Sequence, residues 1–249
     1  MGMFDGLDKI ARKKLTMFYL VDTSGSMDGT KIGELNAAME DLLPEMAEIS
    51  KTHPDADLEI AVLDFNSSVK WQCPEGPVSY EKYQWHDLKA NGMTALGAAC
   101  EELNKKLSKS HGFMNDGNGY LSPVFILLSD GAATDDFEKG LAILKQNVWF
   151  RAGLKFAIAI GDDAEKSELV KFTGDENSVK EVHNKLQLKK MIEVVSLTSS
   201  QVASSGRIVE IDENNLNPNA APDANPAQGE LNEKIAATIA DFDPEDVDF

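Results

Sequence analysis

Oxygen donors gather in Asp22-Thr23-Ser24-Gly25-Ser26, directly after the apolar run Leu15–Val21. The apolar run predicts a buried strand. The loop that leaves it therefore carries one carboxylate and two hydroxyls at alternate positions. In an open α/β sheet, ligands bind at the carboxyl ends of the strands. Since Mg²⁺ and Mn²⁺ prefer oxygen ligands together with water, the pattern predicts a divalent-cation site.

Two further segments add oxygen atoms to this site. Val124–Leu128 is a second apolar run, and Ser129-Asp130-Gly131 follows it. Between the two runs, the turn 91–97 opens a helical segment with Thr94 near its start. The expected metal ligands therefore lie on separate loops: Asp22, Ser24, Ser26, Thr94 and Asp130. The alternative interpretation is an ordinary polar turn, with each Ser or Asp only capping a helix.

This set of residues resembles the metal-ion-dependent adhesion site (MIDAS) of von Willebrand factor A (vWA) domains. The family pattern is Asp-x-Ser-x-Ser, then a Thr, then an Asp, and the resemblance covers residues 14–205. It implies direct metal contact by Ser24, Ser26 and Thr94, and contact through water by Asp22 and Asp130. The implied cofactor is Mg²⁺, with Mn²⁺ or Ca²⁺ as alternatives. Met93 departs from the family, where small residues are usual, and is expected to narrow the groove beside the metal.

A finer resemblance concerns one bacterial branch of the family. The stretches 20–27, 92–99, 127–131 and 158–174 are similar to TerY-like proteins, named for tellurium resistance. This resemblance implies an intracellular A domain that is often encoded beside a protein kinase and a PP2C-type phosphatase. The implied role is a scaffold or regulator in a stress response or in kinase and phosphatase signalling.

The elements that position the site follow from the hydrophobic pattern. Strands that alternate with helices predict a doubly wound, mostly parallel α/β sheet, Rossmann-like as in vWA domains, with helices on both faces. Val69–Trp71 is expected as a short antiparallel edge strand. Pro44 is expected to kink or end the helix 31–48, and Asp163 to cap the helix 164–172. Aromatic residues of the connection 73–90 are expected to fill a small core, with a partner-binding surface as the alternative.

The chain divides by composition into a domain and an acidic end. We expect an N-terminal extension at 1–13, a vWA domain at 14–208, a disordered linker at 209–228, and an acidic tail at 229–249 with a short helical segment. Eleven of the acidic residues and one lysine lie between 210 and 249, a net charge of −10 out of −18. The segment from 214 onward is expected to be dispensable for folding. Its acidic, Phe-containing end is either a solubilising tail or a peptide that docks on a partner.

Several classes of function are disfavoured. The net charge of −18 argues against nucleic acid and against anionic membrane surfaces as partners. No apolar stretch reaches the roughly 18 residues that span a membrane, and no secretory signal is recognisable, so a cytoplasmic location is expected. Cys73 and Cys100 form no disulfide framework, and the four histidines lack zinc spacing.

Three functions remain, and the first is a binding module rather than an enzyme. In it, an Asp or Glu of a partner protein completes the metal's coordination shell. The second is a regulatory subunit of an AAA⁺ ATPase machine. The third is a Mg²⁺-dependent phosphoryl-transfer enzyme, which would need a second carboxylate where Ser24 stands. No Gly-x-x-x-x-Gly-Lys phosphate loop is present.

Overall fold

A seven-stranded sheet forms the centre of the computed structural model, which describes residues 12–52, 56–115, 119–205 and 226–240. The strand order is β3-β2-β1-β5-β6-β7, and β4 also pairs with β2. The parallel strands are β1 (Lys13–Asp22), β2 (Ala56–Phe65), β5 (Val124–Ser129), β6 (Leu154–Ile160) and β7 (Val179–Val182). The sequence prediction of a mostly parallel α/β sheet is thereby confirmed.

Two short strands run antiparallel to β2. The first, β3 (Val69–Trp71), has the predicted bounds. The second, β4 (Val78–Ser79), pairs with Glu59 and Ile60 and is not predicted from the sequence. Its two residues are too few for a hydrophobic period to be recognised.

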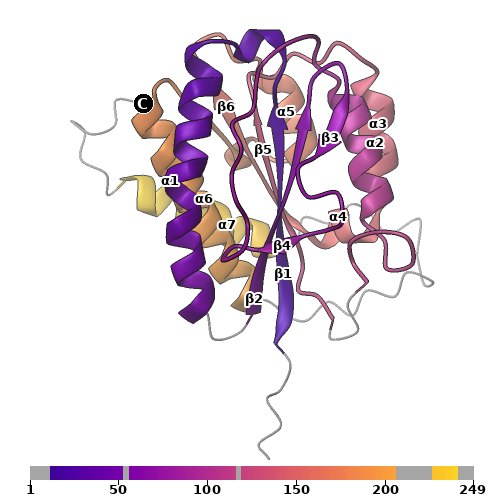
Figure 1. Ribbon diagram of the computed structural model, residues 1–249, viewed down its shortest axis with the longest axis vertical. Coiled ribbons are helices and arrows are strands. Elements are labelled where there is room, and N and C mark those ends of the chain that lie inside the picture. Colours follow the sequence, from indigo (N-terminus) through magenta and orange to yellow (C-terminus); the bar gives the residue numbers. More distant parts are fainter. Residues whose placement is uncertain (1–11, 53–55, 116–118, 206–225, 241–249) are drawn as a thin grey trace, which may run out of the picture.

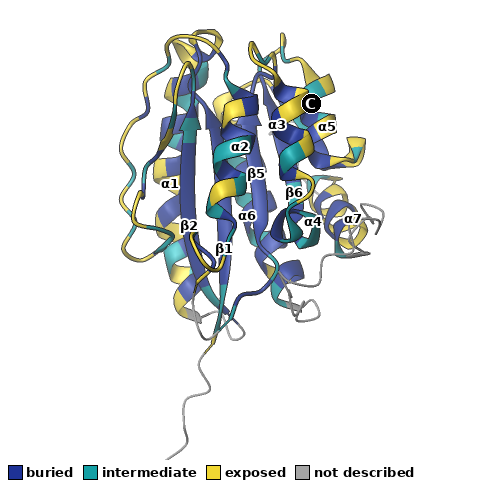
Figure 2. Ribbon diagram, turned by 90° about the vertical axis from the view of Figure 1, so that its right-hand side faces the viewer, coloured by how far each residue is buried: buried dark blue, intermediate teal, exposed yellow. Residues whose placement is uncertain are grey.

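Helices cover both faces of the sheet (Figure 1). On one face lie α1 (Thr30–Thr52), α6 (Lys185–Ser205) and α7 (Pro226–Ala240). On the other lie α2 (Leu96–Lys106), α3 (Phe137–Leu144), α4 (Val148–Ala152) and α5 (Lys166–Thr173). Short 3₁₀ turns, η1 (Gly25–Met27) and η2 (Glu176–Ser178), complete the elements. The central strands are buried along most of their length (Figure 2).

Burial on both faces explains why β1 is an unbroken apolar run. Met17, Tyr19 and Val21 belong to the core under α1 and α6. Phe18 and Leu20 belong to the core under α2 and α3. Because successive side chains of a strand point to opposite faces, a strand between two helical layers needs apolar residues at every position.

The expected end of the first helix near Pro44 and the expected cap at Asp163 are both wrong. Helix α1 continues through Pro44 to Thr52, because Pro44 lies on the exposed side, where water can bind the carbonyl that the proline leaves unpaired. Helix α5 begins at Lys166, and its N-cap is Glu165, whose side chain accepts a hydrogen bond from the Ser167 amide. Asp163 instead pairs with Lys31 across the fold.

The aromatic residues of the connection after β3 take part in the core. Trp71 and Tyr80 are buried, while Tyr83 and Trp85 are partly buried and pack against core residues. The Tyr80 hydroxyl lies 3.2 Å from that of Tyr19. These aromatic residues therefore extend the two main cores, instead of filling the separate small core that was expected.

The C-terminal helix differs from the expected appendage. It begins at Pro226, before the expected end of the linker at 228, and it packs on α6 and β6. Leu231 and Ile235 are fully buried there. The expectation that the segment from 214 onward is dispensable for folding is therefore revised for α7. Parts of three predicted segments lie outside the described residues. They are residues 1–11 of the N-terminal extension, residues 209–225 of the linker and residues 241–249 of the acidic tail.

Gln228 attaches α7 to an open part of a strand. Its side-chain amide accepts from the Lys155 amide at 2.8 Å and donates to the Lys155 carbonyl at 2.8 Å. Strand β7 pairs with β6 only from Ala157 onward, so Gln228 supplies the hydrogen bonds that a neighbouring strand would make. Asn232 adds contacts to Ser178 at 3.0 Å and to Asp175 at 2.7 Å.

The buried Lys155 side chain gives this part of β6 a pH-dependent stability that can be measured. Burial, together with the charge of Lys145, lowers the pKa of Lys155 to about 8. Between pH 8 and the ordinary lysine pKa near 10.5, the unfolded chain binds more protons than the folded chain, so this group's contribution to stability rises with pH. Lys155→Met should be more stable than the natural chain at pH 7, and the difference should shrink as the pH rises through that window. Urea unfolding at several pH values measures it, and a pH-independent difference would contradict it.

Candidate metal site

Asp22 is the last residue of β1, and its carboxylate is anchored from two sides. One oxygen, Oδ1, accepts a hydrogen bond from the Ser24 amide at 2.8 Å. The other, Oδ2, accepts from the Ser129 hydroxyl at 2.6 Å. Asp22 is fully buried. The end of β1 and the end of β5 are therefore joined through one carboxylate.

Four of the five predicted residues form a continuous hydrogen-bonded series. From Asp22 it passes through the Ser24 amide to the Ser24 hydroxyl, which lies 3.0 Å from the Ser26 hydroxyl. The Ser26 hydroxyl donates to Asp130 Oδ1 at 2.9 Å. Asp22, the last residue of β1, and Asp130, which follows the end of the neighbouring β5, are thus connected through the Ser24 amide and two hydroxyls at the carboxyl edge of the sheet.

Thr94 lies on an adjoining loop that is attached to both others. Asn91 donates its amide to the Thr23 carbonyl at 2.8 Å, and Gly25 donates to the Gly92 carbonyl at 3.0 Å. On its other side, the Thr94 amide donates to the Thr134 hydroxyl at 3.0 Å, and the Thr134 amide donates to the Thr94 carbonyl at 2.8 Å. These contacts place the loop of Thr94 beside the loops of Asp22 and Asp130.

Glycine is required at the turn that presents Asp130. Gly131 has a φ of +104°, and a Cβ there would lie 1.9 Å from the Glu165 carbonyl oxygen. The Glu165 amide in turn donates to the Asp130 carbonyl at 2.7 Å. The close approach of this backbone to the loop before α5 holds Asp130 in place.

The electrostatics of Asp22 suit a nearby cation. Burial raises the pKa of Asp22, hydrogen bonds from Ser129 and Ser24 oppose the rise, and repulsion from Asp130 adds to it. Its contacts are a hydroxyl and a backbone amide rather than a basic side chain. A buried carboxylate held only by neutral donors is costly, and a divalent cation in the adjacent oxygen cluster would offset that cost. The donor set therefore fits the metal that the resemblance implies.

Three residues with a role here are missed from the sequence. Ser129 holds Asp22, and its position directly before Asp130 is the only signal for it. Asp135 accepts from the amides of Gly97 and Ala98 at 2.9 and 2.8 Å, which fixes the start of α2 just after Thr94. Lys31 donates to Asp130 Oδ2 at 3.0 Å. A lysine in the first turn of a helix is the signal for it, since that end of a helix disfavours cations.

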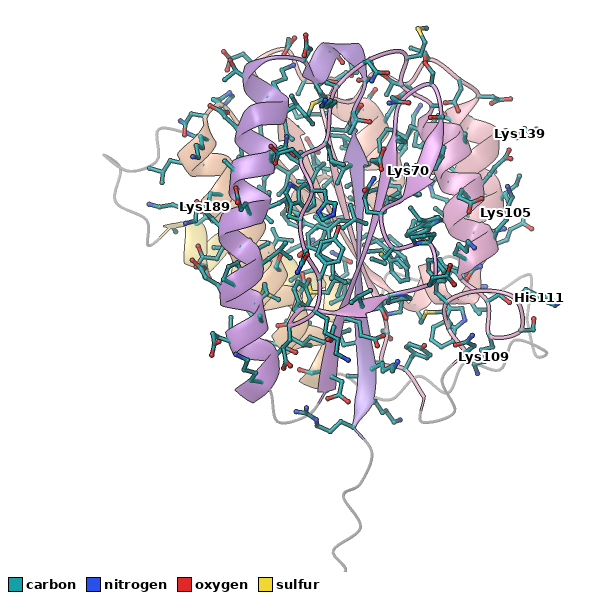
Figure 3. All side chains as sticks on the ribbon, in the orientation of Figure 1. Lys70, Lys105, Lys109, His111, Lys139 and Lys189 are labelled. Atoms are coloured by element: carbon teal, nitrogen blue, oxygen red, sulfur yellow. The ribbon has the colours of Figure 1, made fainter. Side chains whose placement is uncertain are left out.

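Three of the lysines labelled in Figure 3 lie elsewhere. Lys105, Lys109 and Lys189 project from the flanks of the molecule, away from the edge where the strands end. Within the described ranges, no group of three or more His, Cys, Asp or Glu side chains could hold a metal ion. The oxygen cluster thus differs from a carboxylate cage, because it combines two carboxylates with hydroxyls.

The same part of the chain contains no helix long and apolar enough to cross a membrane.

Comparison with known proteins gives matches at the level of structure. No family model matches the sequence, and no curated protein does. A von Willebrand factor type A protein from Catenulispora acidiphila superposes with a TM-score of 0.55 and 18% identity over 75% of this chain and 43% of that chain. Proximal thread matrix protein 1 from the mussel byssus superposes with a TM-score of 0.54 and 21% identity over 76% of this chain and 46% of that chain.

Two further structures agree. The ArnB paralog VWA2 from Sulfolobus acidocaldarius gives a TM-score of 0.53 and 18% identity over 73% of this chain and 45% of that chain. The mussel protein has also been solved with zinc in its MIDAS motif. That structure superposes with a TM-score of 0.51 and 20% identity over 73% of this chain and 44% of that chain. This chain spans less than half the length of each of these proteins. At these identities the likeness concerns the fold, and the fold of this chain is that of a von Willebrand factor A domain.

Proposed function

We propose that this protein is a metal-dependent protein-interaction module with a MIDAS-type site. The observation that carries the proposal is the hydrogen-bonded series from Asp22 through Ser24 and Ser26 to Asp130, with the loop of Thr94 attached beside it. These residues would hold one divalent cation, Mg²⁺ in the first instance. The cation supplies a Lewis-acidic position for an outside ligand.

The donor chemistry favours a carboxylate as that ligand. Hydroxyl groups carry no formal charge, and both oxygens of Asp22 accept hydrogen bonds from protein groups. A cation held mainly by neutral oxygen keeps most of its charge, so an incoming Asp or Glu of a partner is attracted to it. Metal binding and partner binding should therefore reinforce each other.

The geometry argues against the phosphoryl-transfer alternative. An aspartyl nucleophile needs a carboxylate oxygen that faces a substrate, whereas Asp22 is buried and engaged through both oxygens. At the position where such enzymes place a second carboxylate, the chain has Ser24. A binding role needs neither feature.

The setting of the module is a finer part of the proposal. The TerY-like resemblance supports an intracellular scaffold or regulator that works with a protein kinase and a PP2C-type phosphatase. A regulatory subunit of an AAA⁺ ATPase is the alternative partner system. Met93, beside Thr94, has a side chain that is 57% exposed and would contact a partner bound at the metal.

Partner capture tests the function. A tagged full-length chain should retain specific proteins from a bacterial lysate in Mg²⁺ and release them in EDTA. Asp130→Asn should retain none of them, while Asp28→Asn, which removes an equal charge from the exposed end of η1, should retain them all. Recovery of an ATPase in place of a kinase or phosphatase would select the alternative system. Retention that is unaffected by EDTA and by Asp130→Asn would contradict a metal-dependent module.

A further inference from the structure

Lys31 joins two carboxylates from different parts of the fold. Its ammonium donates to Asp130 Oδ2 at 3.0 Å and to Asp163 Oδ1 at 2.7 Å. The other oxygen of Asp130 accepts the hydroxyl of Ser26. A single carboxylate therefore connects a fixed cation on one side with the proposed metal-binding hydroxyls on the other. The Lys31 side chain is only 19% exposed, so water screens its charge less than that of a surface lysine.

Two features show that the fold is arranged around this lysine. Lys31 lies in the first turn of α1, where the helix dipole disfavours a cation, and that turn contains no acidic residue. In addition, Gly161 has a φ of +97°, and a Cβ there would lie 2.6 Å from Lys31 Cε. The turn after β6 thus leaves room for the lysine stem, and Asp130 and Asp163 offset the unfavourable position of the charge.

We propose that Lys31 is a built-in cation of the metal site, which lowers the site's affinity for a divalent cation and keeps a bound cation attractive to a partner's carboxylate. This rests on the proposed function of the same site. The ammonium neutralises part of the charge of Asp130, and it repels a second cation in the oxygen cluster. Less negative charge then surrounds the metal, so a carboxylate of a partner is attracted by a more positive electrostatic potential.

The proposal predicts that replacing Lys31 and replacing Asp163 have opposite effects on the affinity for a divalent cation. Lys31→Met keeps the length of the side chain and removes its charge, so it should tighten Mn²⁺ binding by about tenfold, the size of effect that a neighbouring charge has on a proton site. Asp163→Asn removes a negative charge at an exposed position and should weaken Mn²⁺ binding. Lys31→Arg keeps the charge and should bind Mn²⁺ like the natural chain.

A matched control is available on the flank of the molecule. Lys189 also pairs with two carboxylates, Asp41 at 3.4 Å and Glu45 at 4.0 Å, and Figure 3 places it away from the strand ends. Lys189→Met changes the net charge by the same amount and should leave Mn²⁺ affinity unchanged. Titration calorimetry with Mn²⁺ alone on the full chain measures all five proteins, and circular dichroism verifies that each is folded.

The outcomes separate this inference from the proposed function. Tighter binding by Lys31→Met with weaker binding by Asp163→Asn supports it. If both variants weaken binding, or if Lys31→Met binds like the natural chain, Lys31 only braces the loops and the inference is overturned while the metal site stands. If neither the natural chain nor Lys31→Met binds Mn²⁺, the metal site itself is wrong, and the inference is overturned with it.

Discussion

Replacing Asp22 with alanine is expected to weaken Mg²⁺ binding by about a hundredfold, the upper range for loss of a carboxylate that orients metal ligands. The physical reason is that Asp22 holds the Ser24 amide at 2.8 Å and the Ser129 hydroxyl at 2.6 Å, so its removal frees both neighbouring loops. It also removes one of the two negative charges of the oxygen cluster. Titration calorimetry with Mg²⁺ on the full chain measures the loss.

Controls separate metal binding from folding in this experiment. Asp22→Ala leaves a buried hydroxyl and a buried amide without their acceptor, so it should also lower the melting temperature. Asp22→Asn keeps an acceptor oxygen and the side-chain shape, and should lose Mg²⁺ affinity with a smaller loss of stability. Asp28→Ala, an exposed acid of the same segment, should bind Mg²⁺ normally. Equal Mg²⁺ affinity of the natural chain and a folded Asp22→Asn would remove Asp22 from the site.

The second large effect is expected in the C-terminal helix. Leu231 is fully buried against the domain, so Leu231→Ala should lower the free energy of unfolding by about 3 kcal/mol, which is typical for a buried leucine. For a domain of this size the melting temperature should fall by roughly 6 to 12 °C. Thermal unfolding followed by circular dichroism gives the value.

Glu233→Ala provides the control on the same helix. Glu233 is exposed on α7, so its replacement should change the melting temperature by little. A chain that ends before Pro226 should lose at least as much stability as Leu231→Ala, because it also loses Ile235 and the hydrogen bonds of Gln228 to Lys155. If the truncated chain melts like the full chain, α7 is an appendage, as its composition first indicates.

Much of the architecture can be predicted because it is encoded in short stretches. The apolar runs predict β1 and β5, since a strand buried on both faces needs apolar residues at consecutive positions, and β3 has the predicted bounds. The oxygen donors can be named from the sequence for a similar reason. They follow directly after such runs, and the carboxyl ends of parallel strands meet at one edge of the sheet.

Contacts between distant segments could be decided only by the tertiary structure. Asp163 has the local sequence of a helix cap, yet it pairs with Lys31, which lies 132 positions earlier in the chain. Gln228 lies in an Asn- and Pro-rich stretch that is typical of a linker, but an open stretch of β6 gives its amide two backbone partners. Local composition reports secondary-structure propensity and hydrophobic period. The order of strands in the sheet decides which distant charges meet and which strand edge remains open. The sequence by itself determined the oxygen donors and the buried strands, and the tertiary structure decided that Lys31 accompanies the donors and that α7 belongs to the domain.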